Sequence, residues 1–244
     1  ALTKELAEKA WELLNEIESQ GGMLEALKLG SVQESIATVL LERQQNVNFR
    51  KDKIVGTNMY ANIKETPIGQ SETKDKKQSS DVRFSIKPIK AVRISESFEQ
   101  LRNASEYYLR TTGERPKVGL INLGTIPKHK PRADFITGFF EAGGFHVMKN
   151  DGYLTVKDAI VGAKSMNLTT YIFCGMDESY AEMVPGICSE LKEFNKDIRF
   201  FIAGKKENET QFTDTGINDF IHMGTNCFEF LQQLQQEMGV KQHD

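Results

Sequence analysis

The feature that most constrains this chain is a regular alternation of apolar runs and helical segments over its second half. The apolar runs lie at 117–123, 144–148, 168–174, 198–204 and 217–221. Segments with helical spacing of apolar residues follow them, at about 131–142, 155–166, 177–194, 206–212 and 225–238. Parallel strands joined by right-handed crossovers produce such a pattern. The pattern therefore predicts a flavodoxin-like (Rossmann-like) α/β fold, with a five-stranded parallel sheet of order 2-1-3-4-5.

The first 63 residues do not continue this pattern. Apolar residues recur at helical spacing from Leu2 to Ile17, and Gly21-Gly22 ends that helix. Ser31 and Glu34 form a capping-box pair before a second helix. Residues 53–58 are typical of a short strand. Two helices and one strand are too little to enclose a core, so we expect an incomplete domain whose apolar side chains, such as Leu6, Leu13 and Ile17, favour self-association.

A change of composition separates this part from the α/β part. Residues 64–83 contain almost no apolar side chains, which predicts a linker or a mobile loop. Residues 95–113 then have the spacing of a helix. The sequence therefore predicts three parts: an incomplete domain at 1–63, a linker and connecting helix at 64–115, and the α/β domain at 116–244.

Composition excludes several classes of protein. The chain has 244 residues and a net charge of −3, which favours neither nucleic acid nor an anionic membrane as a partner. No apolar run is long enough to span a bilayer, and no signal peptide is visible. The cysteines Cys174, Cys188 and Cys227 are scattered and lie in apolar surroundings, which indicates buried thiols and a cytoplasmic protein.

The segment from Pro127 to Arg132 follows the first predicted strand, where open α/β sheets bind their ligands. It resembles the Asp-x-His-x-x-Gly motif of cobalamin-binding modules, but only in part. The histidine is present at His129, whereas Pro127 stands at the Asp position and Arg132 at the Gly position. We therefore expect a cobalamin-binding type of fold that has lost its cobalamin site.

His129 has two interpretations. An imidazole can bind cobalt, but a metal-bound histidine usually donates its other N–H to a carboxylate, and loss of that partner costs about 10–100-fold in affinity. Pro127 offers no side-chain acceptor, and Arg132 places a long cation where a bulky ligand needs space. The other interpretation is an exposed loop histidine. Among other groups, Asp177 and Glu178 suit a helix start better than catalysis.

Other motifs make the resemblance more specific. Segments of the chain are similar to the carboxyl-terminal part of the methylmalonyl-CoA mutase family, most closely to its small, non-catalytic subunit. The matching residues are Trp11-Glu12-Leu13-Leu14, Gly21-Gly22-Met23, Ile54-Val55-Gly56-Thr57-Asn58-Met59-Tyr60, Phe98-Glu99 and Leu101-Arg102. The resemblance implies that residues 1–63 are a helical remnant of a (β/α)8 barrel domain.

The resemblance also implies two further cofactor patterns that make room for the nucleotide tail. In place of Ser-x-Leu after the third strand, the chain has Cys174-Gly175-Met176, and in place of Gly-Gly after the fourth it has Ala203-Gly204. Cys174 and Gly204 are thus the positions of a predicted tail slot, with His129 as a vestigial cobalt ligand.

The resemblance implies a structural role. In two-subunit mutases the large subunit binds adenosylcobalamin and the acyl-CoA, and interconverts methylmalonyl-CoA and succinyl-CoA. We expect this chain to have no catalytic residues and no cofactor of its own, and to form a heterodimer with that large subunit. The alternative is a working corrinoid-binding module that uses His129. A third possibility, a generic flavodoxin-like binding domain, is disfavoured by the order of motifs in residues 1–102.

Overall fold

A computed structural model describes residues 1–65, 86–89, 91–205, 212 and 215–241. The chain forms two compact units. The first contains Ala1–Gln45 and Thr66–Arg93, and the second contains Asn46–Glu65 and Ile94–Asp244. The predicted division at 64 and 116 stays a prediction. The expected linker at 64–83 and the helix at 206–212 lie largely outside the described residues.

The first unit consists of helices. They are α1 (Leu2–Ser19), α2 (Met23–Leu29) and most of α3 (Ser31–Asn48), so one helix more than predicted is present in residues 1–63. Helix α1 ends before Gly21-Gly22, as expected. The predicted capping box is wrong, because Ser31 is already helical and its hydroxyl donates to Gln20 and to the Ala26 carbonyl. Helix α1 buries none of its side chains.

The predicted strand at 53–58 is also wrong. This segment, in the second unit, is a series of turns with one isolated bridge between Val55 and Met59. The side chain of Asn58 is the reason. Its Oδ1 accepts from the Ile54 amide at 2.8 Å, and its Nδ2 donates to the carbonyls of Val47 and Asp52 at 2.9 and 2.8 Å. These bonds satisfy the backbone groups that a strand would pair.

The second unit contains the predicted sheet. Its strands are β1 (Lys117–Asn122), β2 (His146–Met148), β3 (Thr170–Cys174), β4 (Arg199–Ala203) and β5 (Ile217–Ile221). All pairs are parallel and the order is β2-β1-β3-β4-β5, which confirms the flavodoxin-like prediction. The helices are α4 (Glu96–Thr112), α5 (Ile126–Glu141), α6 (Val156–Met166), α7 (Asp177–Phe194) and α8 (Cys227–Glu237).

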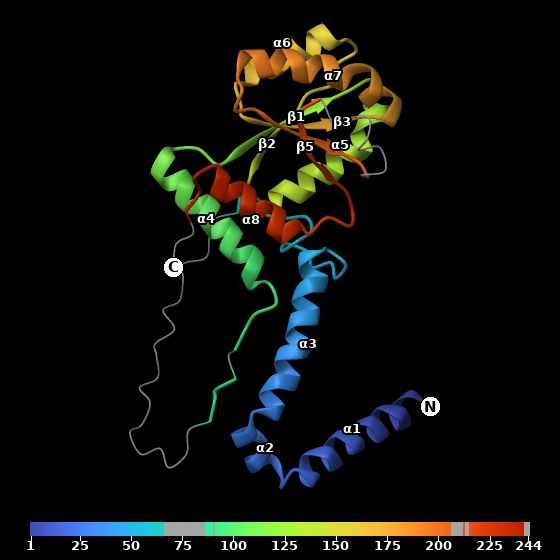
Figure 1. Ribbon diagram of the computed structural model, residues 1–244, viewed down its shortest axis with the longest axis vertical. Coiled ribbons are helices and arrows are strands. Elements are labelled where there is room, and N and C mark those ends of the chain that lie inside the picture. Colours follow the sequence, from blue (N-terminus) through green and yellow to red (C-terminus); the bar gives the residue numbers. More distant parts are fainter. Residues whose placement is uncertain (66–85, 90, 206–211, 213–214, 242–244) are drawn as a thin grey trace. The chain divides into compact units, whose positions relative to one another are not determined.

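Each face of the sheet has its own core (Figure 1). On one face, α5 and α8 with α4 pack through residues such as Ile136, Phe140 and Leu231. On the other, α6 and α7 pack through residues such as Ile160 and Ile187. The strands alternate between these two cores, because successive side chains of a strand point to opposite faces. Both faces are covered, as parallel sheets require.

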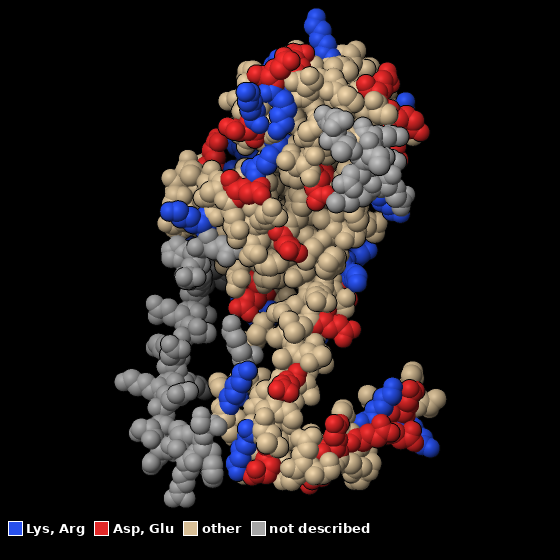
Figure 2. Space-filling view, viewed as in Figure 1, with Lys and Arg blue, Asp and Glu red and all other residues tan. Residues whose placement is uncertain are grey.

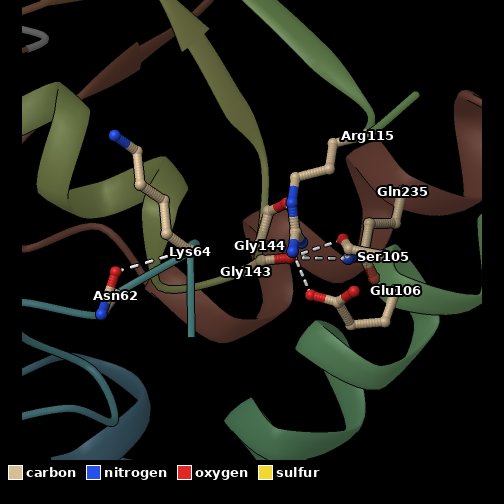
Figure 3. Close-up of polar contacts among 8 residues, drawn as sticks. All are labelled: Asn62, Lys64, Ser105, Glu106, Arg115, Gly143, Gly144 and Gln235. Carbon is tan, nitrogen blue, oxygen red and sulfur yellow. Dashed lines mark hydrogen bonds and ion pairs between the residues drawn. The ribbon is translucent and has the colours of Figure 1, made fainter. Parts of the chain in front are cut away.

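Helix α4 is joined to this unit by polar contacts (Figure 3). The Gln235 amide nitrogen donates to the Ser105 hydroxyl oxygen and the Gly143 carbonyl at 2.9 and 3.0 Å. It also contacts the Leu101 carbonyl at 2.9 Å. Ser105 also donates to Gly143 at 2.7 Å. Gln235 is buried, so these bonds replace water that it has lost. The connecting helix is therefore an integral part of the α/β unit.

Charges are mixed on the surface. Figure 2 shows acidic and basic side chains interspersed over the face in view, consistent with the small net charge. None of the described helices is both long and apolar enough to cross a membrane.

Candidate functional site: the carboxyl edge of the sheet

The carboxyl ends of β1, β3 and β4 meet at one edge, where the sequence predicts a ligand site. The connection after β1 is much shorter than expected. Helix α5 begins at Ile126, so Pro127 to Arg132 form its first turns instead of a loop that ends at Pro131. Pro127 lies in the first turn, where a missing N–H costs nothing. Pro131 lies inside the helix. The helical hydrogen bond that its missing N–H cannot make is the one to the carbonyl of Pro127, in the first turn.

His129 is buried on this helix, with 4% of its surface exposed. The exposed loop histidine considered above is therefore wrong. Its Nδ1 lies 3.2 Å from the Gly124 carbonyl oxygen, which can only accept, so Nδ1 carries the proton in this contact. Gly152 covers the ring, because a Cβ built there would lie 2.6 Å from Cε1 of His129. Gly152 has a φ of +102°, which also favours glycine.

The segment after β2 closes over the end of β1. The Asn122 side-chain nitrogen donates to the Asn150 carbonyl at 2.8 Å, and the Asn150 side chain donates to the Leu120 carbonyl at 2.6 Å. Backbone bonds of 2.8 Å join Gly124 to Tyr153 and Tyr153 to Asn122. These contacts hold Gly152 over His129. Among the described residues, the buried Oδ1 of Asn122 has no hydrogen-bond partner.

Arg132 extends from α5 across the ends of β3 and β4. Its Nη1 donates to the Gly175 carbonyl at 2.7 Å and lies 2.8 Å from a carboxylate oxygen of Asp177. Its guanidinium carbon is 5.2 Å from the ring centroid of Tyr180, a cation–π distance. Burial alone would lower the pKa of Arg132, but its interactions with Asp177 and Tyr180 outweigh burial and raise that pKa. Arg132 is therefore a firmly held cation.

Tyr180 on α7 joins the ends of two strands. Its hydroxyl accepts from the Gly175 amide at 2.9 Å and lies 2.9 Å from the Ala203 carbonyl, to which it donates. Burial raises the pKa of this phenol, so it stays protonated and can donate. The sequence patterns did not indicate a role for Tyr180. The signal they carry is its place in the first turn of α7, five residues after Gly175.

The predicted slot positions lie at this same edge. Cys174 ends β3 and is fully buried, and burial raises the pKa of its thiol. Gly204 follows β4, and a Cβ built on it would lie 3.9 Å from Nη1 of Arg132. The structure thus brings Arg132, Gly175 and Gly204 together. Asp177 begins α7, as predicted, and is also the partner of Arg132.

These residues do not fit a corrinoid. The imidazole of His129 is covered by Gly152, and a guanidinium lies where the slot needs space. Among the residues that the structure describes, no cluster of three His, Cys, Asp or Glu side chains could hold a metal ion. His146 begins β2 and His222 follows the carboxyl end of β5.

The sheet order and the helices on both faces define the class: a flavodoxin-like α/β protein. A solved structure of a cobalamin-binding protein from Desulfitobacterium hafniense DCB-2 is 22% identical, with a TM-score of 0.42 over 57% of this chain and 66% of that one. That likeness is too weak to bear on the site.

The particular resemblance is to methylmalonyl-CoA mutase small subunits, which confirms the resemblance inferred from the motifs. Residues 1–113 match the family model described as methylmalonyl-CoA mutase. The chain is 25% identical over 240 residues to the small subunit from Porphyromonas gingivalis, across 98% of this chain and 38% of that protein. It is 29% identical over 239 residues to the small subunit from Streptomyces virginiae, across 98% of this chain and 36% of that protein. The chain therefore spans little more than a third of these relatives.

Proposed function

We propose that this chain acts as a non-catalytic small subunit of a methylmalonyl-CoA mutase. It pairs with a large subunit that binds adenosylcobalamin and acyl-CoA and interconverts methylmalonyl-CoA and succinyl-CoA. The chain itself keeps the fold of a cobalamin-binding module and contributes no catalytic group. The similarity to proteins named as mutase small subunits supports the family part of this proposal.

The position of Arg132 is the observation that best supports the loss of the cofactor site. A ligand tail entering between α5 and the strand ends would have to displace a guanidinium that is bonded to Gly175, paired with Asp177 and stacked on Tyr180. The displaced charge would need new partners in a partly buried place, which is costly. The side chain therefore acts as an internal occupant of the slot.

One observation favours the alternative, a corrinoid module that uses His129. The Gly124 carbonyl serves as an acceptor for Nδ1, so Pro127 does not leave the ring without a partner. This tautomer keeps the Nε2 lone pair available as a metal ligand. The acceptor is neutral, however, and the ring would have to leave its place beneath Gly152 before it could reach an external cobalt.

The test is an absorption spectrum after incubation with adenosylcobalamin and desalting. We expect no retained corrinoid at micromolar protein. The variant Pro127→Asp alone should change little, because Arg132 still fills the slot, whereas Pro127→Asp with Arg132→Gly should retain measurable corrinoid. Adding His129→Ala to that pair should abolish the gain. Tight binding by the unmodified chain that His129→Ala removes would establish the alternative instead.

The structural role needs its own measurement. The purified chain with added adenosylcobalamin should not turn over methylmalonyl-CoA, whereas co-expression with a mutase large subunit should give a stable complex on size-exclusion chromatography. Turnover by the chain alone would contradict the proposal, and so would failure of the large subunit from the same source to co-purify.

A further inference from the structure

A second site is indicated by Arg50, away from the cluster around Arg132. Arg50 follows the end of α3 and has a φ of +57°, which is uncommon for a residue with a side chain. Its amide donates to the Val47 carbonyl at 3.0 Å, and the Lys51 amide donates to the Asn46 carbonyl at 2.8 Å. These capping bonds fix the backbone and so fix the direction of the Arg50 side chain.

The guanidinium of Arg50 lacks strong acceptors. Its Nε and Nη1 are buried and have no nitrogen or oxygen acceptor among the described residues, and the neighbouring thiol of Cys227 offers only a weak sulfur acceptor. Its Nη2 contacts the Met59 sulfur at 2.7 Å, and its carbon lies 5.6 and 5.8 Å from the ring centroids of Phe135 and Phe139. A thioether is a weak acceptor, and an aromatic face accepts no directed bond from most N–H groups. Arg50 is therefore a permanent charge with buried donors that strong acceptors would satisfy.

The guanidinium lines a hollow of about 90 Å³ in the second unit. The lining contains three basic side chains, no acidic one and several apolar ones; it consists of Arg50, Lys53, Met59, Phe135, Phe139, His222, Met223 and Thr225. We call this the Arg50 hollow. The hollow has room for a small organic group beside the guanidinium.

His222 adds a second donor to the Arg50 hollow. Its Nδ1 accepts from the Gly224 amide at 3.0 Å, so in the neutral ring the proton is on Nε2. The neighbouring hydroxyl of Thr225 accepts from the His222 amide at 2.9 Å, which fixes this turn before α8. Burial raises the pKa of the adjacent Cys227 thiol to about 12, against the opposing influence of Arg50, so no thiolate neutralises the guanidinium.

We propose that the Arg50 hollow binds a small free carboxylate with a short apolar chain. A carboxylate offers two oxygens to a guanidinium and forms the charge-assisted bonds that Arg50 lacks. The apolar walls, Met59, Phe135 and Phe139, then pack on the short chain. Inorganic phosphate is polar on every side and would place oxygens against those walls, so the hollow should prefer the carboxylate. This inference does not depend on the proposed mutase role.

The experiment uses sodium propionate as the probe, with sodium chloride at equal ionic strength as the blank and sodium phosphate as the comparator. Binding is followed on the whole chain by thermal unfolding and by the NMR signal of the His222 ring. Propionate should give a saturable shift in both, and phosphate should bind at least threefold more weakly. Arg50→Met keeps the apolar stem without the charge and should weaken propionate at least tenfold. The matched control Lys157→Met removes an exposed lysine on α6 and should leave binding unchanged.

Several results would overturn the proposal. They are the absence of saturable binding, equal binding by Arg50→Met, equal binding of phosphate, or crystals soaked in propionate that show only water at Nε and Nη1. If Arg50→Met does not fold, Lys53→Met and His222→Phe take its place. Each should weaken propionate at least threefold, and the proposal fails if both bind as the unmodified chain does.

Discussion

On the proposed function, Arg132 is a single residue that fills a ligand site while the fold stays intact. From the sequence, we expect Arg132 to place a long cation where a bulky ligand needs space, with no indication of its partners. In the structure, its side chain crosses the sheet edge and gains a carbonyl, a carboxylate and an aromatic ring. These three partners lie 43 or more positions later in the chain, so no local pattern around Arg132 indicates them.

The first prediction concerns this residue. Arg132→Ala should lower the free energy of unfolding by about 1–2 kcal/mol, from a lost hydrogen bond of about 1 kcal/mol and a partly exposed ion pair of less. The control Lys130→Ala removes an exposed pair with Asp134 on the same helix and should stay within about 0.5 kcal/mol. Urea unfolding at pH 7 measures both. Equal losses in the two variants would show that Arg132 is not specially held.

The second prediction concerns the thiols. Cys174, Cys188 and Cys227 are free and buried, and burial raises the pKa of Cys188 and of Cys227 to about 12. A raised thiol pKa leaves the unreactive protonated form at pH 8. The native protein should therefore react slowly with a chromogenic disulfide reagent, and all three thiols should react at once in guanidinium. A fast native phase of one equivalent would contradict the buried placement.

At the scale of elements, the strands followed from the apolar runs, because β1, β3 and β4 are buried on both faces, whereas the edge strands β2 and β5 are only partly buried. The strand order followed from the fold class that the alternation of strands and helices predicts. The beginning of α5 did not. Pro131 fits the first turn of a helix so well that the sequence places the start there, yet the structure starts at Ile126. Long-range packing decides this: burying His129 against Gly124 and Gly152 requires one more helical turn. The strand expected at 53–58 is absent for a related reason. The side chain of Asn58 satisfies the local backbone groups that a neighbouring strand would otherwise pair.

The third prediction tests the attachment of α4. Gln235→Leu removes the hydrogen bonds of this amide nitrogen and leaves the Leu101 and Gly143 carbonyls with fewer donors. We expect a loss of about 2–4 kcal/mol, because buried polar groups without partners are costly. The control is Gln233→Leu, on the same helix, where the exposed side chain bonds only Glu237. Thermal or urea unfolding measures the stability of both variants. If Gln235→Leu leaves the free energy of unfolding unchanged, apolar packing alone holds α4.

At the scale of the whole molecule, helix α1 exposes its apolar side chains. It buries no side chain, and Leu6, Trp11 and Leu13 are 70%, 64% and 62% exposed. This accords with the expectation that residues 1–63 are an incomplete domain, which stays a prediction. Exposed apolar surface of this kind marks an interaction site or a tendency to aggregate.

The fourth prediction follows from that surface. The purified chain should self-associate as its concentration rises, and Leu6→Lys with Leu13→Lys should reduce this by placing charges on the apolar side of α1. Light scattering coupled to size exclusion gives the mass of each species. The control Lys4→Glu with Lys9→Glu changes charge but not apolar area. If the two double variants self-associate equally, the apolar side of α1 is not the surface responsible.

The bonds of Arg132 also have an evolutionary consequence. On the proposed function, a descendant that changed Arg132 alone to glycine would lose helix stability and an ion pair while Pro127 still offered His129 no carboxylate. A descendant that changed Pro127 alone would still have a filled slot. Neither single step gains a ligand and one of them weakens the fold, so selection would favour neither step by itself. The loss of the site would then be hard to reverse, and lineages that inherit it should retain the contacts of Arg132 and the buried packing of His129.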